Sequence, residues 1–503
     1  GHPPALDRFV ERLAAETPPL ARIDRIAAVD VGVIGDASFT IVESAAANGP
    51  RTLVPPDVAI CDDCAADIAD PADRRFRYPF TNCTNCGPRF TIIRDLPYDR
   101  PATTMADFEM CADCAAEYAD PADRRYHAQP VACPACGPRV SYAAGDVELR
   151  GTDRVLAAVQ TDLAAGRVVA IKGLGGYHLA CDATDAAAVG LLRERKGRSD
   201  KPFAVMVADT DTLDSIAHAD HDELTAILGP AHPIVLLRRR VGSGLADSVA
   251  PGNPMIGVML PYTPLHRLLF EPVPGSDVEP PSVIVLTSGN RANEPICFRD
   301  DEARTRLVDL ADAFCTHDRS IEVPCDDSVV RVIDGEIQPI RRSRGYAPVP
   351  VSLPVDVAPA RGVGGELKNT CCVASGRRAW VGQHVGDMEN LETLDAFGAS
   401  VAAFTTMYDV APAVLGVDRH PDYLTGRWAR DRTAVDRCRI IEVQHHHAHV
   451  AALMAEHRLD GTTPVLGFAF DGTGFGSDAG GGVEIWGGEV LLADYRTFER
   501  VGH

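Results

Sequence analysis

The sequence predicts a multidomain α/β protein in which a tandem four-cysteine zinc-finger region precedes two larger units. Three observations lead to this prediction. The chain has 503 residues, which is too long for a single hydrophobic core. Two sets of four cysteines follow one another with the same internal spacing. After them, helix-like segments alternate with β-rich runs, which is the pattern of α/β domains.

The overall composition is ordinary for a globular protein. Charged residues make up 24% of the chain and hydrophobic residues 46%. The formal net charge is −22, so a general electrostatic attraction to nucleic acid or to an anionic membrane is not expected. No apolar run approaches the roughly 20 residues of a membrane helix, and no secretory signal pattern opens the sequence. We expect a cytoplasmic protein that binds neither nucleic acid nor membrane.

Both cysteine sets have the spacing C-x2-C-x18-C-x2-C, and the second set begins fifty residues after the first. Four thiolates about 2.3 Å from one ion are typical ligands of structural zinc. An iron–sulfur site or redox dithiols would use the same ligands, and disulfides would require an oxidising compartment. We predict two closed structural Zn²⁺ sites without an open position for chemistry. Their ligands are Cys61, Cys64, Cys83 and Cys86 in one site and Cys111, Cys114, Cys133 and Cys136 in the other.

The segment before the cysteines has too few elements for a domain of its own. Leu6, Phe9 and Leu13 recur at helical spacing in PALDRFVERLAAE, and an alternating strand is expected from about Ile26 to Val33. One helix and one strand cannot bury a core. We interpret residues 1–45 as the end of a domain whose beginning is absent.

After the cysteines, the second unit carries two candidate ligand-binding segments. KGRSDKP places Lys196, Arg198 and Lys201 in a turn between a helix pattern and a strand, where their cations suit a di- or triphosphate. A solvated basic loop is the alternative. SVIVLTSGN ends an apolar strand on Ser288 and Asn290, at the edge where an α/β sheet meets its ligand. A turn that binds nothing explains these residues equally well.

The segments CDDSVVRV and RRSRGYAP close this unit with a concentration of charge. Taken alone, they would form an ion-paired surface or a junction between domains. The residues concerned are Asp326, Asp327, Arg341, Arg342 and Arg344.

The third unit contains the segments whose residue types best suit a catalytic site. GVGGELKNT places Lys368 after glycines that could cradle a phosphate, although such turns usually only reverse the chain. In QHHHAH, His445 and His449 are four residues apart and share a helix face, a spacing that can chelate a metal. In isolation such a pair is more often surface or core. Asp471 in FDGTG ends an apolar strand, and with the two histidines it would leave open metal positions.

Taken in order, these motifs resemble the hydrogenase maturation carbamoyltransferase family HypF. The resemblance covers nearly the whole chain, and the order of the motifs is more specific than any one of them. It implies a remnant of an acylphosphatase-like domain at 1–45, the tandem zinc-finger region at 46–140 and a YrdC-like α/β domain at 141–350. Residues 351–503 would be the N-terminal part of a threonylcarbamoyl-transferase-like domain with an actin-like, ASKHA-type fold. The motifs are the two cysteine sets, KGRSDKP, SGNRANEPI, CDDSVVR, RRSRGYAP, GELKNT, QHHHAH and FDGTG.

The resemblance implies an ATP-dependent carbamoyltransferase. Family members convert carbamoyl phosphate and ATP to carbamoyl adenylate and carbamoylate the C-terminal cysteine of HypE, from which the cyanide ligands of NiFe-hydrogenase derive. The implied cofactors are two structural Zn²⁺ ions, Mg²⁺ with ATP, and a divalent metal, Fe or Zn, in the transferase domain. The implied partners are ATP, carbamoyl phosphate and the HypE tail.

Site roles follow residue by residue from the matching motifs. Lys196, Arg198 and Lys201 match the phosphate cluster of the YrdC-like domain, Ser288 and Asn290 match its nucleotide motif, and Lys368 matches a nucleotide-binding segment by position. His445, His449 and Asp471 match the metal ligands of the transferase domain. The implied catalytic residues are Lys196, Arg198, His445, His449 and Asp471.

Two features of the family have no counterpart in this sequence, namely the arginine loop of the acylphosphatase-like domain and the later metal aspartate of the transferase domain. We therefore expect this chain to be only partly active. Our interpretation from sequence is that the transferase-like domain forms the adenylate and the YrdC-like domain hands the carbamoyl group to the acceptor. An O-carbamoyltransferase acting on a small molecule would not need the cysteine repeat, and a zinc-ribbon adaptor would leave QHHHAH and FDGTG without a purpose.

Overall fold

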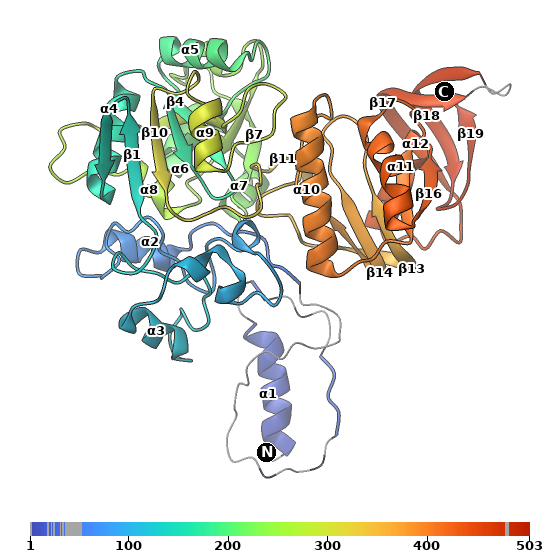
Figure 1. Cartoon of the computed structure of the whole chain (residues 1–503), viewed down its shortest axis with the longest axis horizontal. Helices are drawn as coiled ribbons and strands as arrows, with labels where there is room; N and C mark the ends of the chain where they lie inside the picture. Colours follow the sequence, from blue (N-terminus) through green and yellow to red (C-terminus); the bar gives the residue numbers. More distant parts are fainter. Residues whose placement is uncertain are drawn as a thin grey trace.

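The computed structural model describes a defined part of the chain, which comprises residues 3–17, 20, 21, 23, 26–30, 32, 35, 53–477 and 482–503, without the side chains of 434–436 and 477. Within this part, an N-terminal helix is followed by a finger region, a large sheet with its helices, and two smaller sheets with theirs (Figure 1). None of the described helices combines the length and the apolar character that crossing a membrane requires.

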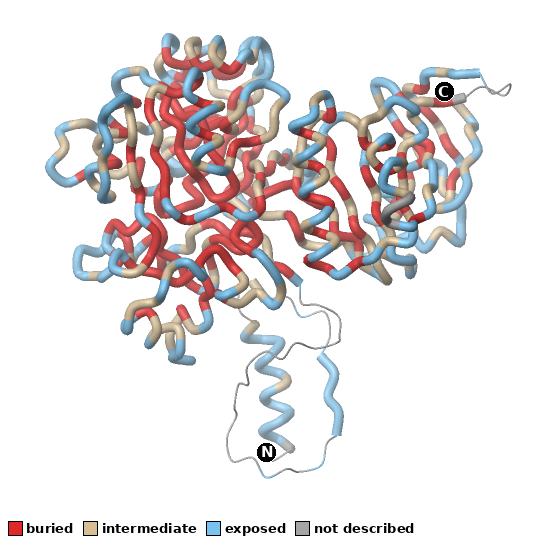
Figure 2. Tube along the Cα trace, in the orientation of Figure 1, coloured by how far each residue is buried: buried red, intermediate tan, exposed pale blue. Residues whose placement is uncertain are grey.

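The N-terminal segment confirms one prediction and corrects another. The expected amphipathic helix is α1 (Pro3–Ala15), which is exposed over most of its length (Figure 2). Its apolar Leu6 and Phe9 are exposed too. Residues 26–30 and 32 of the expected strand are not in a strand, so the prediction is wrong for them; residues 31 and 33 lie outside the described part. An extended segment becomes a strand only when another strand pairs with it.

The finger region is built from short helices and turns. In each repeat a helix begins directly after the first cysteine, with Cys61 and Cys111 at the N-cap positions. These helices are α2 (Asp62–Ala69) and α3 (Ala112–Ala119), and single turns of 3-10 helix lie between them: η1 (Phe90–Ile92), η2 (Arg100–Ala102) and η3 (Thr104–Asp107).

One twelve-stranded sheet of mixed direction follows the fingers. Its strands run in the order β12-β11-β7-β8-β5-β9-β4-β3-β10-β1-β2, with β6 paired to β7. The pairs β3 with β10, β5 with β8 and β7 with β11 are parallel. The strands are β1 (Val140–Ala144), β2 (Val147–Arg150), β3 (Val169–Lys172), β4 (Tyr177–Asp182), β5 (Ala204–Val207), β6 (Ala217–His218), β7 (Ile234–Arg239), β8 (Met255–Met259), β9 (Val283–Ser288), β10 (Ala313–His317), β11 (Val329–Ile333) and β12 (Glu336–Arg341).

The alternation of helices and strands predicted for this unit is confirmed. Strands such as β3 and β9 begin with continuous apolar runs, because the sheet is buried on both of its faces there. The helices are α4 (Thr152–Ala164), α5 (Ala186–Lys196), α6 (Thr210–Ile216), α7 (His221–Leu228), η4 (Asp247–Val249), α8 (Pro264–Leu269) and α9 (Asp300–Arg306).

The C-terminal part contains two smaller sheets. A four-stranded sheet has the order β14-β13-β15-β16, and a three-stranded sheet has the order β17-β18-β19. The strands are β13 (Val351–Gly362), β14 (Cys372–Val381), β15 (Val414–Asp418), β16 (Arg439–Val443), β17 (Val465–Ser477), β18 (Val483–Ala493) and β19 (Phe498–Gly502). The helices are α10 (Leu391–Tyr408), α11 (Leu424–Asp436) and α12 (His445–Glu456).

The apolar side chains of the fingers belong to cores that they share with both neighbours. Phe80 and Ile92 pack in one cluster with side chains from β1, β3 and α4. Phe90 packs in another cluster with Trp380 and Phe404 of the C-terminal part, and the rings of Phe90 and Phe404 meet edge to face, 5.8 Å apart. The finger region therefore holds the large sheet and α10 together.

We expect Phe90→Ala to lower the free energy of unfolding by about 3–5 kcal/mol, because it leaves a cavity between the fingers and α10. Phe90 is fully buried. Denaturant unfolding measures the change, with Phe76→Ala as the matched control because Phe76 is exposed. Equal stability losses in the two variants would contradict a shared core at this position.

Candidate functional site

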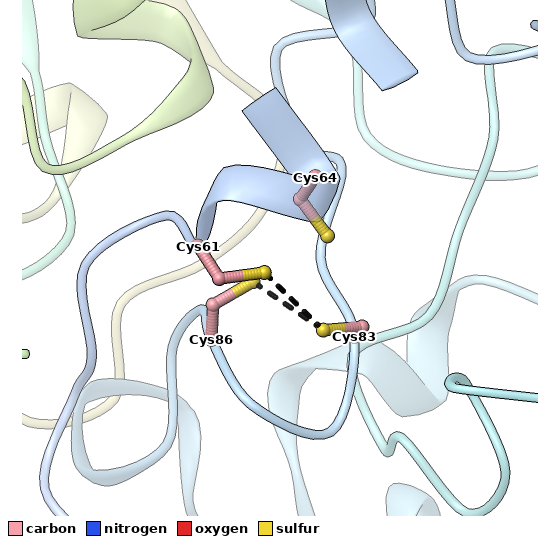
Figure 3. A group of neighbouring side chains, drawn as sticks. All are labelled: Cys61, Cys64, Cys83 and Cys86. Atoms are coloured by element: carbon pink, nitrogen blue, oxygen red, sulfur yellow. Dashed lines mark hydrogen bonds between the residues drawn. The ribbon is translucent and has the colours of Figure 1, made fainter. Parts of the chain in front are cut away.

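The four cysteines of the first repeat converge on one point (Figure 3). The Sγ atom of Cys83 lies 3.6 Å from that of Cys61 and 3.9 Å from that of Cys86. A tetrahedron of sulfurs about 2.3 Å from a central ion has edges of about 3.8 Å. The four ligands therefore fit Zn²⁺.

The second repeat has the same geometry. The Sγ atom of Cys133 lies 3.7 Å from those of Cys111 and Cys136, and the Sγ atoms of Cys136 and Cys114 are also 3.7 Å apart. Both predicted four-cysteine sites are thus assembled, and none of their thiols forms a disulfide. Neither set leaves an open coordination position, so these ions would serve the fold rather than the chemistry.

A cavity of about 790 Å³ lies where the large sheet meets the C-terminal part. This volume is in the range of small-molecule and cofactor sites. Its wall comes from the end of α5, the end of β9, and a loop of the C-terminal part at residues 384–387. All six residues predicted to bind nucleotide line it, namely Lys196, Arg198, Lys201, Ser288, Asn290 and Lys368.

Lys196 reaches the cavity because α5 ends at this residue. Gly197 adopts the left-handed conformation, with φ of 64°, which terminates the helix and starts the KGRSDKP turn. The Nζ atom of Lys196 donates to the backbone oxygens of Ser288 (2.5 Å) and Asn290 (2.7 Å) and to Asn290 Oδ1 (2.6 Å). The lysine therefore fixes the SGN turn in place.

Two cations of this turn, Lys196 and Arg198, have lowered pKa values. Burial, and then repulsion by Arg198, lower the pKa of Lys196 to about 7. Burial, and then repulsion by Arg341, lower the pKa of Arg198 to about 10. Burial and neighbouring cations thus make the charged forms of both side chains costly, which favours an anionic ligand beside them.

A buried network of charges includes two side chains that line the cavity, His178 and Asp327. His178 Nε2 donates to Asp327 Oδ2 (3.0 Å), and Asp327 Oδ1 accepts from Arg344 Nε (2.6 Å). The Arg344 guanidinium also stacks on the ring of Tyr262. Although burial opposes ionisation, the interaction with Arg344 holds the pKa of Asp327 well below its usual range. The charged segments that looked like an ion-paired surface therefore form a buried pair.

The C-terminal part closes one side of the cavity. Lys368 has a positive φ of 47°, and its backbone nitrogen donates to Asp387 Oδ1 (2.7 Å). Asn390 Nδ2 donates to the backbone oxygen of Asn293 in the loop after β9 (2.6 Å). Arg342 Nη1 donates to the backbone oxygen of Val381 (2.6 Å), so this segment contacts the C-terminal part.

The histidine cluster lies at the start of α12. Gln444 caps this helix by accepting from the backbone nitrogen of His447 (2.9 Å). His445 and His449 share one face, and their Nε2 atoms are 3.3 Å apart. The Asp471 Oδ2 atom lies 2.7 Å from His445 Nε2 and 3.5 Å from His449 Nε2. Asp471 can reach them because the pairing of β17 with β18 shifts register between Phe470 and Gly474.

The three ligand atoms suit a divalent metal. Two imidazole nitrogens and one carboxylate oxygen form a facial set with positions left open for substrate, and all three atoms lie within 4.8 Å of one another. The predicted group His445, His449 and Asp471 is therefore brought together.

Family models match the chain along most of its described part. The model described as the HypF finger matches residues 60–93 and 110–143, and the HypF Kae1-like domain matches residues 357–456. The second subdomain of the carbamoyltransferase Kae1-like domain matches residues 467–503. The Sua5, YciO and YrdC model, described as telomere recombination, matches residues 161–343.

Curated relatives agree with these matches. The chain is 46% identical to carbamoyltransferase HypF2 of Cupriavidus necator, with 100% of this chain and 63% of that protein aligned. It is 39% identical to probable carbamoyltransferase HypF of Methanocaldococcus jannaschii, over 98% of this chain and 63% of the relative. The chain belongs to the HypF family. It spans a little under two thirds of the length of these HypF relatives.

Solved HypF structures have the same fold. The crystal structure of full-length HypF in the phosphate- and nucleotide-bound form is 42% identical, with a TM-score of 0.92 over 100% of this chain and 64% of that one. T. kodakarensis HypF is 40% identical, with a TM-score of 0.91 over 100% and 63%. The predicted succession of zinc fingers, YrdC-like domain and Kae1-like domain is confirmed.

Asp418 is a residue of this HypF chain that sequence reasoning missed. His445 Nδ1 donates to Asp418 Oδ2 (2.7 Å), which leaves Nε2 directed at the metal position. The hydrogen bond to Asp418 raises the pKa of His445, while burial and the neighbouring His445 lower the pKa of His449. The sequence did contain an indication of a role for Asp418, because the β-rich run VLGVD ends on this carboxylate, as VLGFAFD ends on Asp471.

The other two histidines of QHHHAH have structural partners. His446 Nε2 donates to the backbone oxygen of Gly487 (2.9 Å), and His447 Nε2 donates to that of Asp494 (2.6 Å). These bonds attach α12 to β18 and to the turn that follows it. Two histidines of this motif, His445 and His449, thus face the candidate metal position. The other two bind the backbone of β18 and of the turn after it.

We expect Asp418→Asn to weaken divalent-metal binding at His445, His449 and Asp471 by about tenfold or more, because partners that orient a metal ligand contribute this much. Calorimetric titration of protein whose cysteine sites already hold zinc measures the change. Asp422→Asn is the matched control, since Asp422 is exposed and pairs with Arg427 instead. Unchanged affinity in Asp418→Asn would show that the carboxylate does not orient the ligand.

Proposed function

We propose that this chain is the zinc-finger, YrdC-like and Kae1-like part of a hydrogenase maturation carbamoyltransferase. The reaction would use ATP and carbamoyl phosphate to form carbamoyl adenylate, and would then carbamoylate the C-terminal cysteine of HypE. The observation that carries the proposal is the cavity that gathers all six predicted nucleotide-binding residues. The relatives named as carbamoyltransferases, and the nucleotide- and phosphate-bound HypF structure, support it.

The cavity suits the adenylation step. Hydrolysis of carbamoyl phosphate by water would break its bond to phosphate and release inorganic phosphate and carbamate. A carbamate oxygen would then attack the α-phosphorus of ATP, and the bond from that phosphorus to pyrophosphate would break. Arg198 and Lys201 supply cations for the phosphates that leave, together with Mg²⁺ that arrives with ATP. Lys196 and Asn290 hold the SGN turn against the nucleotide.

This assignment is the reverse of our interpretation from sequence, in which the transferase-like domain forms the adenylate and the YrdC-like domain transfers the carbamoyl group. The cations predicted to hold phosphates line the YrdC-like cavity, whereas Asp418 adds a carboxylate beside His445 and Asp471. Adenylate formation needs cations near the polyphosphate, and transfer to a thiol does not. We therefore assign adenylation to the YrdC-like domain and transfer to the Kae1-like domain.

In the transfer step, the thiolate of the HypE cysteine would attack the carbamoyl carbon, and the carbon–oxygen bond to AMP would break. His445, His449 and Asp471 would hold a divalent metal, Fe or Zn, which when bound supplies Lewis-acid polarisation of the carbamoyl oxygen. Asp418 orients His445 and keeps its Nε2 directed toward that metal.

Lys368 is proposed to contact the nucleotide from the opposite domain. It is the cation that the Kae1-like part contributes to the cavity, in a loop held by Asp387. Its strained backbone conformation would be retained only where the surrounding structure holds it in place. In this arrangement the adenylate would form where both domains meet, which would limit its exposure to water.

The experiment mixes full-length protein with ATP, carbamoyl phosphate and a HypE tail peptide ending in cysteine. We expect release of pyrophosphate and AMP, and a peptide carrying one added carbamoyl group by mass spectrometry. The double variant Lys196→Ala with Arg198→Ala should release neither pyrophosphate nor AMP. His445→Ala with His449→Ala should retain pyrophosphate release but lose AMP release and peptide carbamoylation.

Each rival predicts a different pattern. An O-carbamoyltransferase acting on a small molecule would release pyrophosphate without modifying the peptide. A zinc-ribbon adaptor would consume no ATP. Normal peptide carbamoylation by the Lys196 and Arg198 double variant would refute the proposed cavity.

We expect nucleotide affinity at the cavity to fall as pH rises from about 7 to 9. Free Lys196 has a pKa of about 7 and loses its proton in this range. A bound phosphate favours the protonated form of Lys196, so binding of the nucleotide takes up a proton. The affinity therefore falls by up to about tenfold for each unit by which the pH rises. Titration with AMP at several pH values measures this slope. Lys201→Gln, at an exposed position of the same turn, should keep the slope, whereas Lys196→Met should lose it.

A further inference from the structure

The second finger repeat contacts the zinc ligands of the first. Arg124 Nη1 donates to Cys64 Sγ at 3.0 Å, and its other nitrogen pairs with Asp67, three residues further along the same helix. Arg125 also pairs with Asp67. One arginine of the second repeat thus contacts a thiolate of the first, and both arginines pair with the carboxylate of Asp67 on the same helix.

The first repeat makes the reciprocal contacts. Arg74 Nη2 donates to Cys114 Sγ at 3.3 Å, and Arg75 Nη2 lies 3.6 Å from the same sulfur. Both arginines pair with Glu117, at 2.6 Å and 2.5 Å. Arg75 is 1% exposed, so this contact is built into the interior of the finger region.

These reciprocal contacts follow from the duplicated sequence. Each helix is followed by the same segment, DPADRR, fifty residues apart. Within it, Asp73 Oδ1 accepts from the backbone nitrogen of Arg75 and Asp123 Oδ1 accepts from that of Arg125, both at 2.7 Å. These equivalent turns direct each arginine pair to the opposite repeat rather than to its own cysteines.

The contacts matter because of charge. Four thiolates around one Zn²⁺ carry a net charge of about −2, which is costly to bury. Cys64 and Cys114 are both fully buried. A guanidinium that donates to the sulfur offsets this charge and keeps the ligand ionised. Among the described contacts of these two sulfurs, the cations come only from the other repeat. Each site therefore depends on the other repeat for this positive charge.

We propose that the two zinc sites form one reciprocal unit, in which Arg124 is a positioning residue for the first zinc and Arg74 for the second. Loss of zinc from one repeat releases its helix and its DPADRR turn, and this withdraws the arginines from the other site. The tandem repeat is then a pair that must load together, rather than two independent fingers. The proposal does not depend on the reaction that the protein catalyses.

The test follows zinc release by the reactivity of individual cysteines. The whole chain, loaded with zinc, is exposed to a chelator and a pulse of alkylating reagent, and modified cysteines are mapped by mass spectrometry. With Arg124→Gln we expect the cysteines of the first repeat, Cys61 to Cys86, to become reactive about tenfold faster. With Arg74→Gln, those of the second repeat should respond first.

Two controls keep the result specific. Arg94→Gln changes an arginine of the same region that pairs with Asp107 and Glu322 instead of a thiolate, and it should leave both rates unchanged. Cys315, buried in the large sheet, reports global unfolding and should stay unreactive. Arg124→Lys keeps the charge but not the forked geometry, so it should restore part of the protection.

The order in which the two repeats react in the same molecules decides the question. Faster reaction that begins in the repeat opposite the substitution and then spreads to the other repeat, while Cys315 stays unreactive, supports the proposal. No change in either repeat, or faster reaction that begins in the repeat carrying the substitution, overturns it. Faster reaction of both repeats together with Cys315 reports a general loss of stability and also counts against the proposal.

Discussion

The structure depends on the finger region, because its apolar side chains belong to cores on both sides. Apart from the buried cysteines, the fingers contribute Phe80 and Ile92 to the core of the YrdC-like domain and Phe90 to a cluster with the Kae1-like part. A segment of this size without a sheet cannot bury enough apolar surface to be stable alone. Zinc would hold the loops in the conformation that presents these side chains. The relative placement of the two larger domains would therefore depend on zinc binding by the fingers.

That placement determines the cavity. Lys196 and the SGN turn come from the YrdC-like domain, but Lys368 and the loop at residues 384–387 come from the other side of the junction. The hydrogen bond from Asn390 to Asn293 joins α10 to the loop that follows the SGN turn. A shift of the Kae1-like part would consequently move one wall of the cavity and the support of the turn together. The cysteine sites and the proposed nucleotide cavity would thus be connected through packing, although none of the eight cysteines lines the cavity.

Most of the local structure could be predicted from the sequence, because it depends on short patterns. The cysteine spacing, the α/β alternation and the helix face shared by His445 and His449 are all local. The contributions of Asp418, of the Asp327 pair with Arg344, and of the crossed arginines could not be predicted. Each depends on segments that are distant in the sequence and meet only in the folded chain. The strand expected near residue 26 failed for the same reason, since an alternating pattern does not supply a partner strand.

The two kinds of metal group differ in the way that their roles require. In the fingers the thiolates are largely buried, and Cys64 and Cys114 already accept bonds from arginines. At the start of α12, the side chain of His449 is 58% exposed and Asp471 sits at a register shift of β17. A closed and compensated site resists exchange, whereas an accessible one with few ligands can admit a substrate. The same chain thus separates the metals that would maintain its shape from the one that would act on the carbamoyl group.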